Sequence, residues 1–195
     1  MSTPEDEIYA QRLYSISNEK WKRSLKLLNP YRLHIRYLIK GSCLDVGAGF
    51  GRNLGYLNNP ANHGIEPNPA LRRLSQVLGH SVVSAIEASS KFEYESFDNL
   101  LFSHVLEHLT PEQHLGILDQ YLPYLKSGGR VVVLIPQEAG FKHDSDHKFF
   151  WTPELMAEYL SDHSLILQKT GSFPLPSIFS RIFIYNEWFL VAAKK

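Results

Sequence analysis

The chain has 195 residues and equal numbers of basic and acidic side chains, 20 of each, so its formal net charge is zero. This length suffices for one well-buried domain, and the neutral charge lacks the global basic field of nucleic-acid-binding proteins. No apolar run approaches the ~20 residues of a membrane span, and the acidic N-terminus is not a secretory signal. The single cysteine, Cys43, excludes an internal disulfide. We therefore expect a cytoplasmic protein without a membrane span.

Residues 5–40 have helical spacing, many aromatic side chains and no glycine. We interpret residues 1–40 as an N-terminal helical cap on a domain of residues 41–195, the whole forming one compact unit. The cap is either a helical layer on a sheet or a lid whose aromatic side chains, Tyr14 and Trp21 among them, shape a substrate pocket.

From residue 42 onward, apolar runs of strand length alternate with segments of helical spacing. The predicted strands are 42–46, 61–66, 81–85, 97–103, 130–135, 164–170 and 187–193. This alternation is typical of an α/β fold with a Rossmann-like, doubly wound sheet.

The helices of the predicted fold begin at recognisable capping sequences. Asn29-Pro30, Asn68-Pro69, Thr110-Pro111 and Thr152-Pro153 each place a capping side chain before a proline. The residues expected to face the core, helix by helix, are Leu33, Tyr37 and Leu38; Leu71, Leu74, Val77 and Leu78; and Leu115, Leu118, Leu122 and Leu125. Pro123 is expected to kink the third of these helices, and Ser127-Gly128-Gly129 to stop it.

A glycine turn follows the first strand. Gly47, Gly49 and Gly51 alternate with other residues, and Leu54 then begins a helical spacing. A strand, a glycine turn and a helix bring the backbone close to a nucleotide-like ligand. Glu66 ends the second strand, 15 residues beyond Gly51, where a carboxylate can accept hydrogen bonds from both hydroxyls of a ribose or favour the start of the next helix.

Five segments in order resemble the class I S-adenosylmethionine-dependent methyltransferases, in particular the small-molecule branch with type 11 or type 23 domains. They are Leu44–Gly51, Ile65–Asn68, Phe97–Leu109, Leu125–Arg130 and Phe150–Leu155. The resemblance covers residues 40–193 and implies a seven-stranded sheet whose last strand is antiparallel. It also implies S-adenosyl-L-methionine as cofactor.

The resemblance implies roles for individual residues. The implied cofactor residues are Asp45, Gly47, Ala48, Gly49, Arg52, Glu66, Pro67, Ile86, Ser103 and His104. Asp45 would orient the turn or meet the amino group of the methionine part, and Glu66 would hold the ribose. Ile86 stands where family members often carry an acid, and it could pack on the adenine.

His104 ends the fourth strand, where it is either a candidate general base or an ordinary polar residue near the cofactor. His108 and His147 join Tyr14 and Trp21 as candidate substrate residues. His104 to His108 also fits the H-x-x-E-H pattern of zinc peptidases, but that pattern needs a helix where a strand end is expected.

Some methyltransferases with a Glu-His pair after this strand bind a divalent ion. Glu107 and His108 form such a pair, and a polar loop could add His143, Asp144, Asp146 and His147. A solvated loop that closes over substrate is the interpretation we favour, so no metal site is predicted.

The predicted function is methyl transfer to a small-molecule acceptor by in-line displacement, with no nucleic-acid partner. Whether the chain is a monomer or a homodimer stays open. The alternatives are a non-catalytic binding protein of the same fold and a nicotinamide-dependent oxidoreductase. The second alternative is disfavoured because Arg52 stands where the pattern G-x-G-x-x-G requires glycine.

Overall fold

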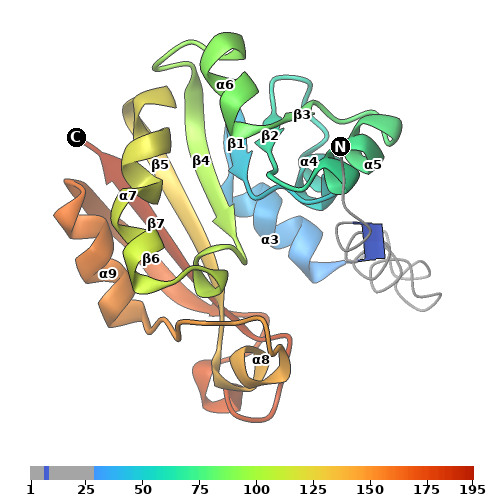
Figure 1. Ribbon diagram of the computed structural model, residues 1–195. Helices are drawn as coiled ribbons and strands as arrows, with labels where there is room; N and C mark the ends of the chain where they lie inside the picture. Colours follow the sequence, from blue (N-terminus) through green and yellow to red (C-terminus); the bar gives the residue numbers. More distant parts are fainter. Residues whose placement is uncertain (1–6, 9–28) are drawn as a thin grey trace.

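The computed structural model describes residues 7, 8 and 29–195, so the predicted substrate residues Tyr14 and Trp21, and the helix predicted around them, lie outside the described residues. Within the described part of the chain, seven strands form one sheet in the order β3-β2-β1-β4-β5-β7-β6 (Figure 1). The strands are β1 (Cys43–Val46), β2 (His63–Ile65), β3 (Val82–Val83), β4 (Phe97–Ser103), β5 (Leu125–Pro136), β6 (Leu165–Phe173) and β7 (Glu187–Lys194).

The sheet is parallel except at one strand. β1 pairs in parallel with both β2 and β4, and β4 in parallel with β5, whereas β7 runs antiparallel to both β5 and β6. This confirms the predicted doubly wound sheet with an antiparallel last strand. The strand order reverses between β1 and β4, and ligands of such sheets bind at the carboxyl edge beside that point.

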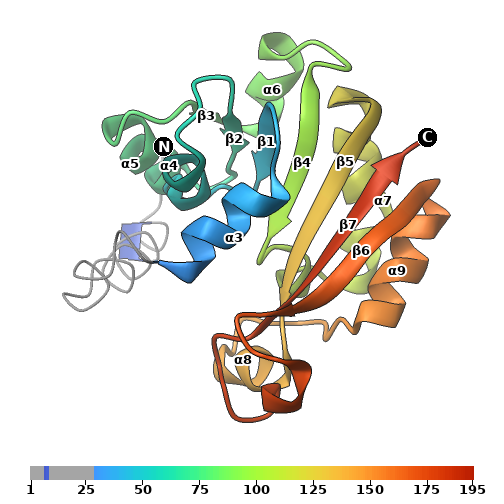
Figure 2. The ribbon, with the colours of Figure 1, turned by 180° about the vertical axis from the view of Figure 1, so that it is seen from behind.

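Helices cover both faces of the sheet (Figures 1 and 2). One face carries α6 (Ala85–Lys91), α7 (Pro111–Tyr121) and α9 (Pro153–Asp162). The other carries α3 (Pro30–Leu38) and α4 (Arg52–Leu57), with α5 (Pro69–Val77) beside them near β3. The remaining elements are the single-turn helices η1 (Leu106–His108), η2 (Leu122–Tyr124) and η3 (Ser177–Phe179), and α8 (Glu138–His143). None of the described helices is long and apolar enough to cross a membrane.

The alternation of side chains along the central strands divides the core between the two faces. Leu100 and Phe102 belong to the cluster under α6, α7 and α9, whereas Leu101 packs with Ile35 and Leu38 of α3. Burial of this apolar surface on both sides is the main favourable contribution to folding. Because α3 supplies part of this core, residues 30–38 are anchored directly on the sheet.

The predicted helix starts are confirmed. Asn29 and Asn68 each accept hydrogen bonds from two backbone N–H groups of the first turns of α3 and α5, and Thr152 caps α9. Thr110 and Gln113 form the capping box of α7. These local signals are reliable because each uses only neighbouring backbone groups.

Several predicted helix faces are wrong. On α3, Leu33 and Tyr37 are exposed, and the buried side chains are His34, Ile35 and Leu38. Others expected in the core are also exposed: Val77, Leu78 and Leu115. Which stripe of a helix is buried depends on where the sheet lies, and a short helix with apolar residues on two sides leaves that choice open.

Three element boundaries also differ from the prediction. The helix expected to run to Leu125 ends at Tyr121, and Leu125 pairs with Phe97 as the first residue of β5, so the glycines at 128 and 129 lie inside the strand. Two helices were not predicted. α6 shortens the third strand, and α8 occupies the start of the loop expected to be polar and irregular.

Candidate cofactor and acceptor site

The glycine turn follows β1 at the carboxyl edge of the sheet. Gly47, Gly49 and Gly51 have φ angles of 76°, 57° and 87°, all in the left-handed region that favours glycine. The N–H groups of Gly47 and Ala48 donate to the carbonyl oxygen of Ile65 at 2.8 and 2.9 Å. The turn is therefore fastened to the end of β2.

Of the three glycines, Gly49 has open space beside it. A Cβ atom on Gly47 would collide with Val105, and one on Gly51 would collide with His80 and Ser75. A Cβ atom on Gly49 would meet no atom within 4 Å. A ligand could therefore approach the main chain at Gly49 without steric hindrance from the side chains around it.

Asp45 is the third residue of β1 and is fully buried. Neither of its carboxylate oxygens accepts a hydrogen bond of good geometry from the described residues. Burial raises the pKa of Asp45 to about 7, although Arg52 and Asn53 act in the opposite direction. A buried carboxylate without a donor lacks the partner that such groups normally have, and a ligand N–H group would supply it.

Glu66 directly follows β2 and is buried. One of its carboxylate oxygens accepts a hydrogen bond from the backbone N–H of Gly49 at 2.9 Å, and the other from that of Asn68 at 2.8 Å. Burial raises the pKa of Glu66, while these two N–H groups and Arg72 partly offset the effect. Each oxygen keeps a second lone pair, so the carboxylate can still accept hydrogen bonds from ligand hydroxyls.

The other predicted cofactor residues differ in their exposure. Ser103 ends β4, and its buried hydroxyl has no hydrogen-bond partner among the described residues. Arg52 begins α4 and is exposed, and its charge is close enough to Asp45 to affect the pKa of that carboxyl. Pro67 is exposed, and Ile86 lies in the first turn of α6 with 86% of its surface exposed.

His104 follows β4 and has a φ angle of 56°, which is uncommon for a residue with a Cβ atom. Its Nδ1 lies 3.2 Å from Oε1 of Glu107, and its Nε2 lies 2.9 Å from Oε2 of Glu187. Burial lowers the pKa of His104, but the hydrogen bonds and charges of the two carboxylates outweigh it and raise the pKa to about 9. With a carboxylate on each ring nitrogen, the geometry does not favour the predicted role of a general base.

His104 and Glu107 belong to a polar cluster with Glu187 and His34, two residues that were not identified from the sequence. Glu187 is the buried first residue of β7, and its Oε1 lies 3.6 Å from Nδ1 of His34 on α3. Burial raises the pKa of Glu187, but His104 and His34 outweigh it and hold the pKa below its ordinary value. The only sequence feature that could have indicated a role for Glu187 is its position as a single acidic residue at the start of an apolar strand. Its pairing with Pro136 of β5 brings it to the carboxyl edge of the sheet.

Aromatic rings pack beside this polar cluster. The ring of His34 stacks on Phe173 at 3.8 Å between centroids, and Tyr31 meets the same phenylalanine edge-on at 5.5 Å. The hydroxyl of Tyr31 donates to the carbonyl oxygen of Tyr185 at 2.8 Å. Burial, followed by the charge of Glu187, raises the pKa of Tyr31 well above its ordinary value. The start of α3 therefore joins the β6–β7 end of the sheet in an aromatic wall.

Two of the four predicted substrate residues lie within the described part of the chain, and they are in contact. The ring centroids of His108 and His147 are 4.7 Å apart, although 38 residues separate the two in sequence. The loop that follows α8 therefore reaches the end of β4.

Comparison with known proteins identifies the class of domain. Residues 44–133 match the family model described as a methyltransferase domain. This match spans β1 to β5 and includes the glycine turn, Glu66 and the end of β4. No curated protein matches the sequence at a significant level.

Solved structures share the fold over nearly the whole chain. A SAM-dependent methyltransferase from Archaeoglobus fulgidus is 18% identical, with a TM-score of 0.68 and coverage of 93% of this chain and 99% of that one. A putative methyltransferase from Haloferax volcanii, solved in complex with the activator Trm112, is 15% identical, with a TM-score of 0.73 and 99% coverage of both chains.

A third structure contains ligands. The 1,6-didemethyltoxoflavin-N1-methyltransferase of Burkholderia thailandensis, solved with its substrate and S-adenosylhomocysteine, is 17% identical, with a TM-score of 0.62 and coverage of 100% and 92%. At these identities the likeness establishes the fold.

Proposed function

The chain carries the domain of the class I S-adenosylmethionine-dependent methyltransferases, and we propose that it transfers the cofactor's methyl group to a small-molecule acceptor. The observation that carries the proposal is the arrangement of three residues at the carboxyl edge of the sheet. Asp45 is buried without a donor, Gly49 has open space beside it, and the carboxylate of Glu66 is bound to the N–H of Gly49. These features fit the amino group, the methionine backbone and the ribose of the cofactor, respectively.

The residues around this arrangement would complete the cofactor site. Asp45 would accept a hydrogen bond from the cofactor's ammonium group, and Gly47, Ala48 and Gly49 would line the methionine part. Glu66 would hold the ribose hydroxyls. The outer residues of the proposed site are Arg52, Pro67, Ile86, Ser103 and His104.

When bound, the cofactor supplies a methyl group on a sulfonium, which is already a strong electrophile. The protein therefore needs mainly to align the acceptor with the methyl group and to exclude water. His104 contributes by position, because its two hydrogen bonds hold Glu107 and Glu187 at the end of β4.

The residues around His104 and Glu187, which we call the proposed acceptor region, support a small acceptor with both apolar and polar groups. Tyr31, His34 and Phe173 offer aromatic surface, and Glu187 with His104 offers charge within the same region. Compact sites of this kind combine apolar walls with a few polar groups that orient the ligand. The net charge of zero supports the same choice, since a nucleic-acid acceptor needs a basic surface.

Calorimetry with S-adenosylhomocysteine tests the cofactor site. We expect the wild type to bind it and Glu66→Ala to bind at least ~10-fold more weakly, because a buried carboxylate that accepts two ligand hydroxyls is lost. Glu158→Ala is the matched control, because Glu158 is exposed on α9 and its substitution should leave the affinity unchanged. Binding of a nicotinamide dinucleotide instead of S-adenosylhomocysteine would overturn the assignment.

A screen of small phenols, carboxylic acids, amines and alcohols, monitored by release of S-adenosylhomocysteine, tests the acceptor. Turnover with a member of one class is the expected result. Tight cofactor binding without turnover in any class would contradict small-molecule transfer and favour a non-catalytic protein of this fold.

A further inference from the structure

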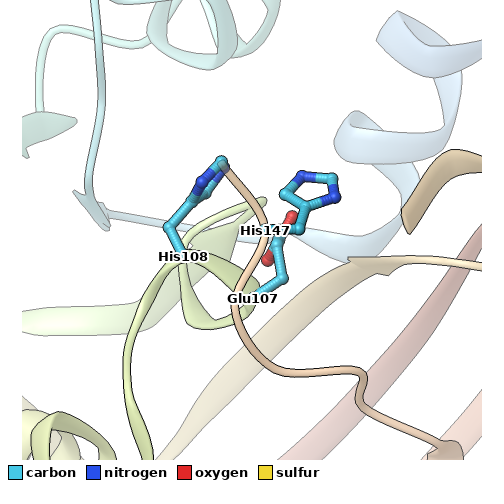
Figure 3. Close-up of side chains that lie close together, drawn as sticks. All are labelled: Glu107, His108 and His147. Atoms are coloured by element: carbon cyan, nitrogen blue, oxygen red, sulfur yellow. The ribbon is translucent and has the colours of Figure 1, made fainter. Parts of the chain in front are cut away.

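Three potential metal ligands meet at the end of β4. One oxygen of Glu107 and one ring nitrogen each of His108 and His147 all lie within 4.8 Å of one another. Figure 3 shows the three side chains gathered in one place, with the carboxylate of Glu107 below the two imidazole rings in this view. Two of these residues belong to η1 and the third to the loop that follows α8, so the cluster joins two segments of the chain.

Glu107 has an unsatisfied oxygen. The residue is 1% exposed, its Oε1 is bound by Nδ1 of His104, and its Oε2 is buried without a hydrogen-bond partner among the described residues. A buried carboxylate oxygen without a partner is costly, and a bound cation would remove that cost. The hydrogen bond from His104 holds the carboxylate in place, as the outer contacts of metal-binding carboxylates do.

Each histidine also has its Nδ1 within hydrogen-bond distance of a backbone carbonyl oxygen. Nδ1 of His147 lies 2.9 Å from the carbonyl oxygen of Phe141, and Nδ1 of His108 lies 3.3 Å from that of Asp146. A carbonyl oxygen can only accept, so in the neutral imidazole Nδ1 carries the proton and Nε2 keeps the lone pair that a metal ion would use. Metal-binding histidines typically donate in this way to a backbone carbonyl.

The backbone holds the two segments together independently of any ligand. The N–H groups of Lys148 and Phe149 both donate to the carbonyl oxygen of Glu107, at 2.7 and 3.2 Å. His147 is therefore fixed beside η1 by its own neighbours in the chain. The three side chains lie together because of the fold, and a ligand would not have to assemble them.

We propose that Glu107, His108 and His147 bind one divalent first-row transition-metal ion. Two imidazoles and one carboxylate are ligands that suit zinc, cobalt or iron, whereas magnesium and calcium prefer oxygen ligands throughout. Ligand atoms bound at ~2.1 Å in tetrahedral geometry lie ~3.4 Å apart, so the widest separation in the cluster, at most 4.8 Å, would contract by up to ~1.4 Å when the ion binds. The alternative is the interpretation drawn from the sequence, a solvated loop without a metal ion. In that case the rings of His108 and His147 only pack against each other.

The site has room for further ligands, since three protein ligands leave a coordination position open in four-coordinate ions. His104 connects it to the proposed acceptor region, because the same imidazole binds Glu107 on one side and Glu187 on the other. An oxygen or nitrogen of the acceptor could take the open position. This role rests on the proposed function, whereas metal binding itself does not.

Titration of the chelator-treated, full-length protein with Co²⁺ tests the proposal, with absorption in the visible range and calorimetry as readouts. We expect one site per chain and displacement of Co²⁺ by Zn²⁺. His147→Ala and His108→Ala should each weaken binding at least tenfold. His143→Ala is the matched control, because His143 is an exposed histidine of the preceding helix and lies outside the cluster.

S-adenosylhomocysteine binding is measured on the same variants, and it should be unchanged in all of them. This separates the two proposals, since failure of cofactor binding in the wild type would overturn the proposed function and leave metal binding intact. Absence of a single Co²⁺ site, or equal losses in His147→Ala and His143→Ala, would overturn the metal site. Mg²⁺ binding as tight as Co²⁺ binding would overturn the choice of metal class.

Discussion

Four residues with left-handed backbone angles lie at the carboxyl edge of the sheet. Gly47, Gly49 and Gly51 follow β1, and His104 follows the neighbouring β4. A side chain in this conformation costs roughly 1–2 kcal/mol, which glycine avoids and His104 does not. The strain at His104 is tolerated where its ring is bonded by two carboxylates.

A pair of glycine substitutions separates backbone strain from ligand contact. Gly49 and Gly79 both have positive φ angles, 57° and 85°, and a Cβ atom on either would meet no atom within 4 Å. We expect Gly49→Ala and Gly79→Ala to lose similar free energies of unfolding, about 1–2 kcal/mol. Only Gly49→Ala should weaken S-adenosylhomocysteine binding in calorimetry, by at least ~10-fold, because the new methyl group occupies the ligand's space. Equal affinities of the two variants would place the cofactor elsewhere.

Asp45 makes cofactor binding depend on pH. Its pKa of about 7 in the folded protein lies above the ordinary 3.8, so near and below neutral pH the carboxyl holds a proton that an ammonium ligand must displace. By linkage, the affinity for S-adenosylhomocysteine should rise roughly eightfold between about pH 6 and pH 7.5. Calorimetry across this range checks the prediction. Asp45→Asn should bind weakly, with little change over the same interval.

The same group affects stability with the opposite sign. The folded state retains the proton more strongly than the unfolded state, so the free energy of unfolding of the cofactor-free protein should fall as the pH rises from about 4 to about 7. Asp45→Asn removes this titrating group. The free energy of unfolding of the variant minus that of the wild type should therefore increase as the pH rises from about 4 to about 7. If urea unfolding finds the difference independent of pH, the buried carboxyl does not titrate as described.

At the scale of elements, helix caps position the walls of the site. Oδ1 of Asn29 accepts hydrogen bonds from the N–H groups of Tyr31 and Arg32, at 3.0 and 3.4 Å, and so fixes the start of α3. This helix carries Tyr31 and His34 to the aromatic wall beside Glu187. The proposed acceptor region therefore depends on a local signal that the sequence contains.

Asn29→Ala should lower the free energy of unfolding by about 1 kcal/mol, because two N–H groups of the first turn lose their acceptor. Asn29→Ser should retain most of that stability, since a serine oxygen can cap the same turn. Urea unfolding monitored by circular dichroism measures both. A serine variant as unstable as the alanine variant would assign the loss to the hydrogen bond from Nδ2 of Asn29 to Tyr56 instead.

At the scale of the whole molecule, charge bears on the class of acceptor. The formal net charge is zero over 195 residues, so the chain has no net attraction for a polyanion. We expect fluorescence anisotropy with a labelled transfer RNA, in the presence of S-adenosylhomocysteine, to show weak binding and little dependence on salt between about 50 and 200 mM. Submicromolar affinity that falls steeply with salt would contradict the proposed small acceptor.

The sequence by itself determined those features whose cause lies within a few neighbouring residues. The asparagine and threonine caps, the glycine turn and the apolar runs of the strands were predicted because each depends on local hydrogen bonds or on periodicity. The alternation of these elements predicted a doubly wound α/β sheet, and the resemblance to the methyltransferases implied its seven strands and antiparallel last strand. Motif order then indicated a methyltransferase domain, and the family-model match over residues 44–133 confirmed it.

The tertiary structure alone decided which distant residues meet at the carboxyl edge. Glu187 and His34 reach His104 only through the register of β7 on β5 and the packing of α3 on the sheet. His147 reaches Glu107 only because a loop bonds to the backbone of η1. Such contacts join residues that are far apart in the chain, and no local propensity encodes them. Spacing therefore identified neither the distant partners of His104 nor which residue of the polar loop joins Glu107 and His108.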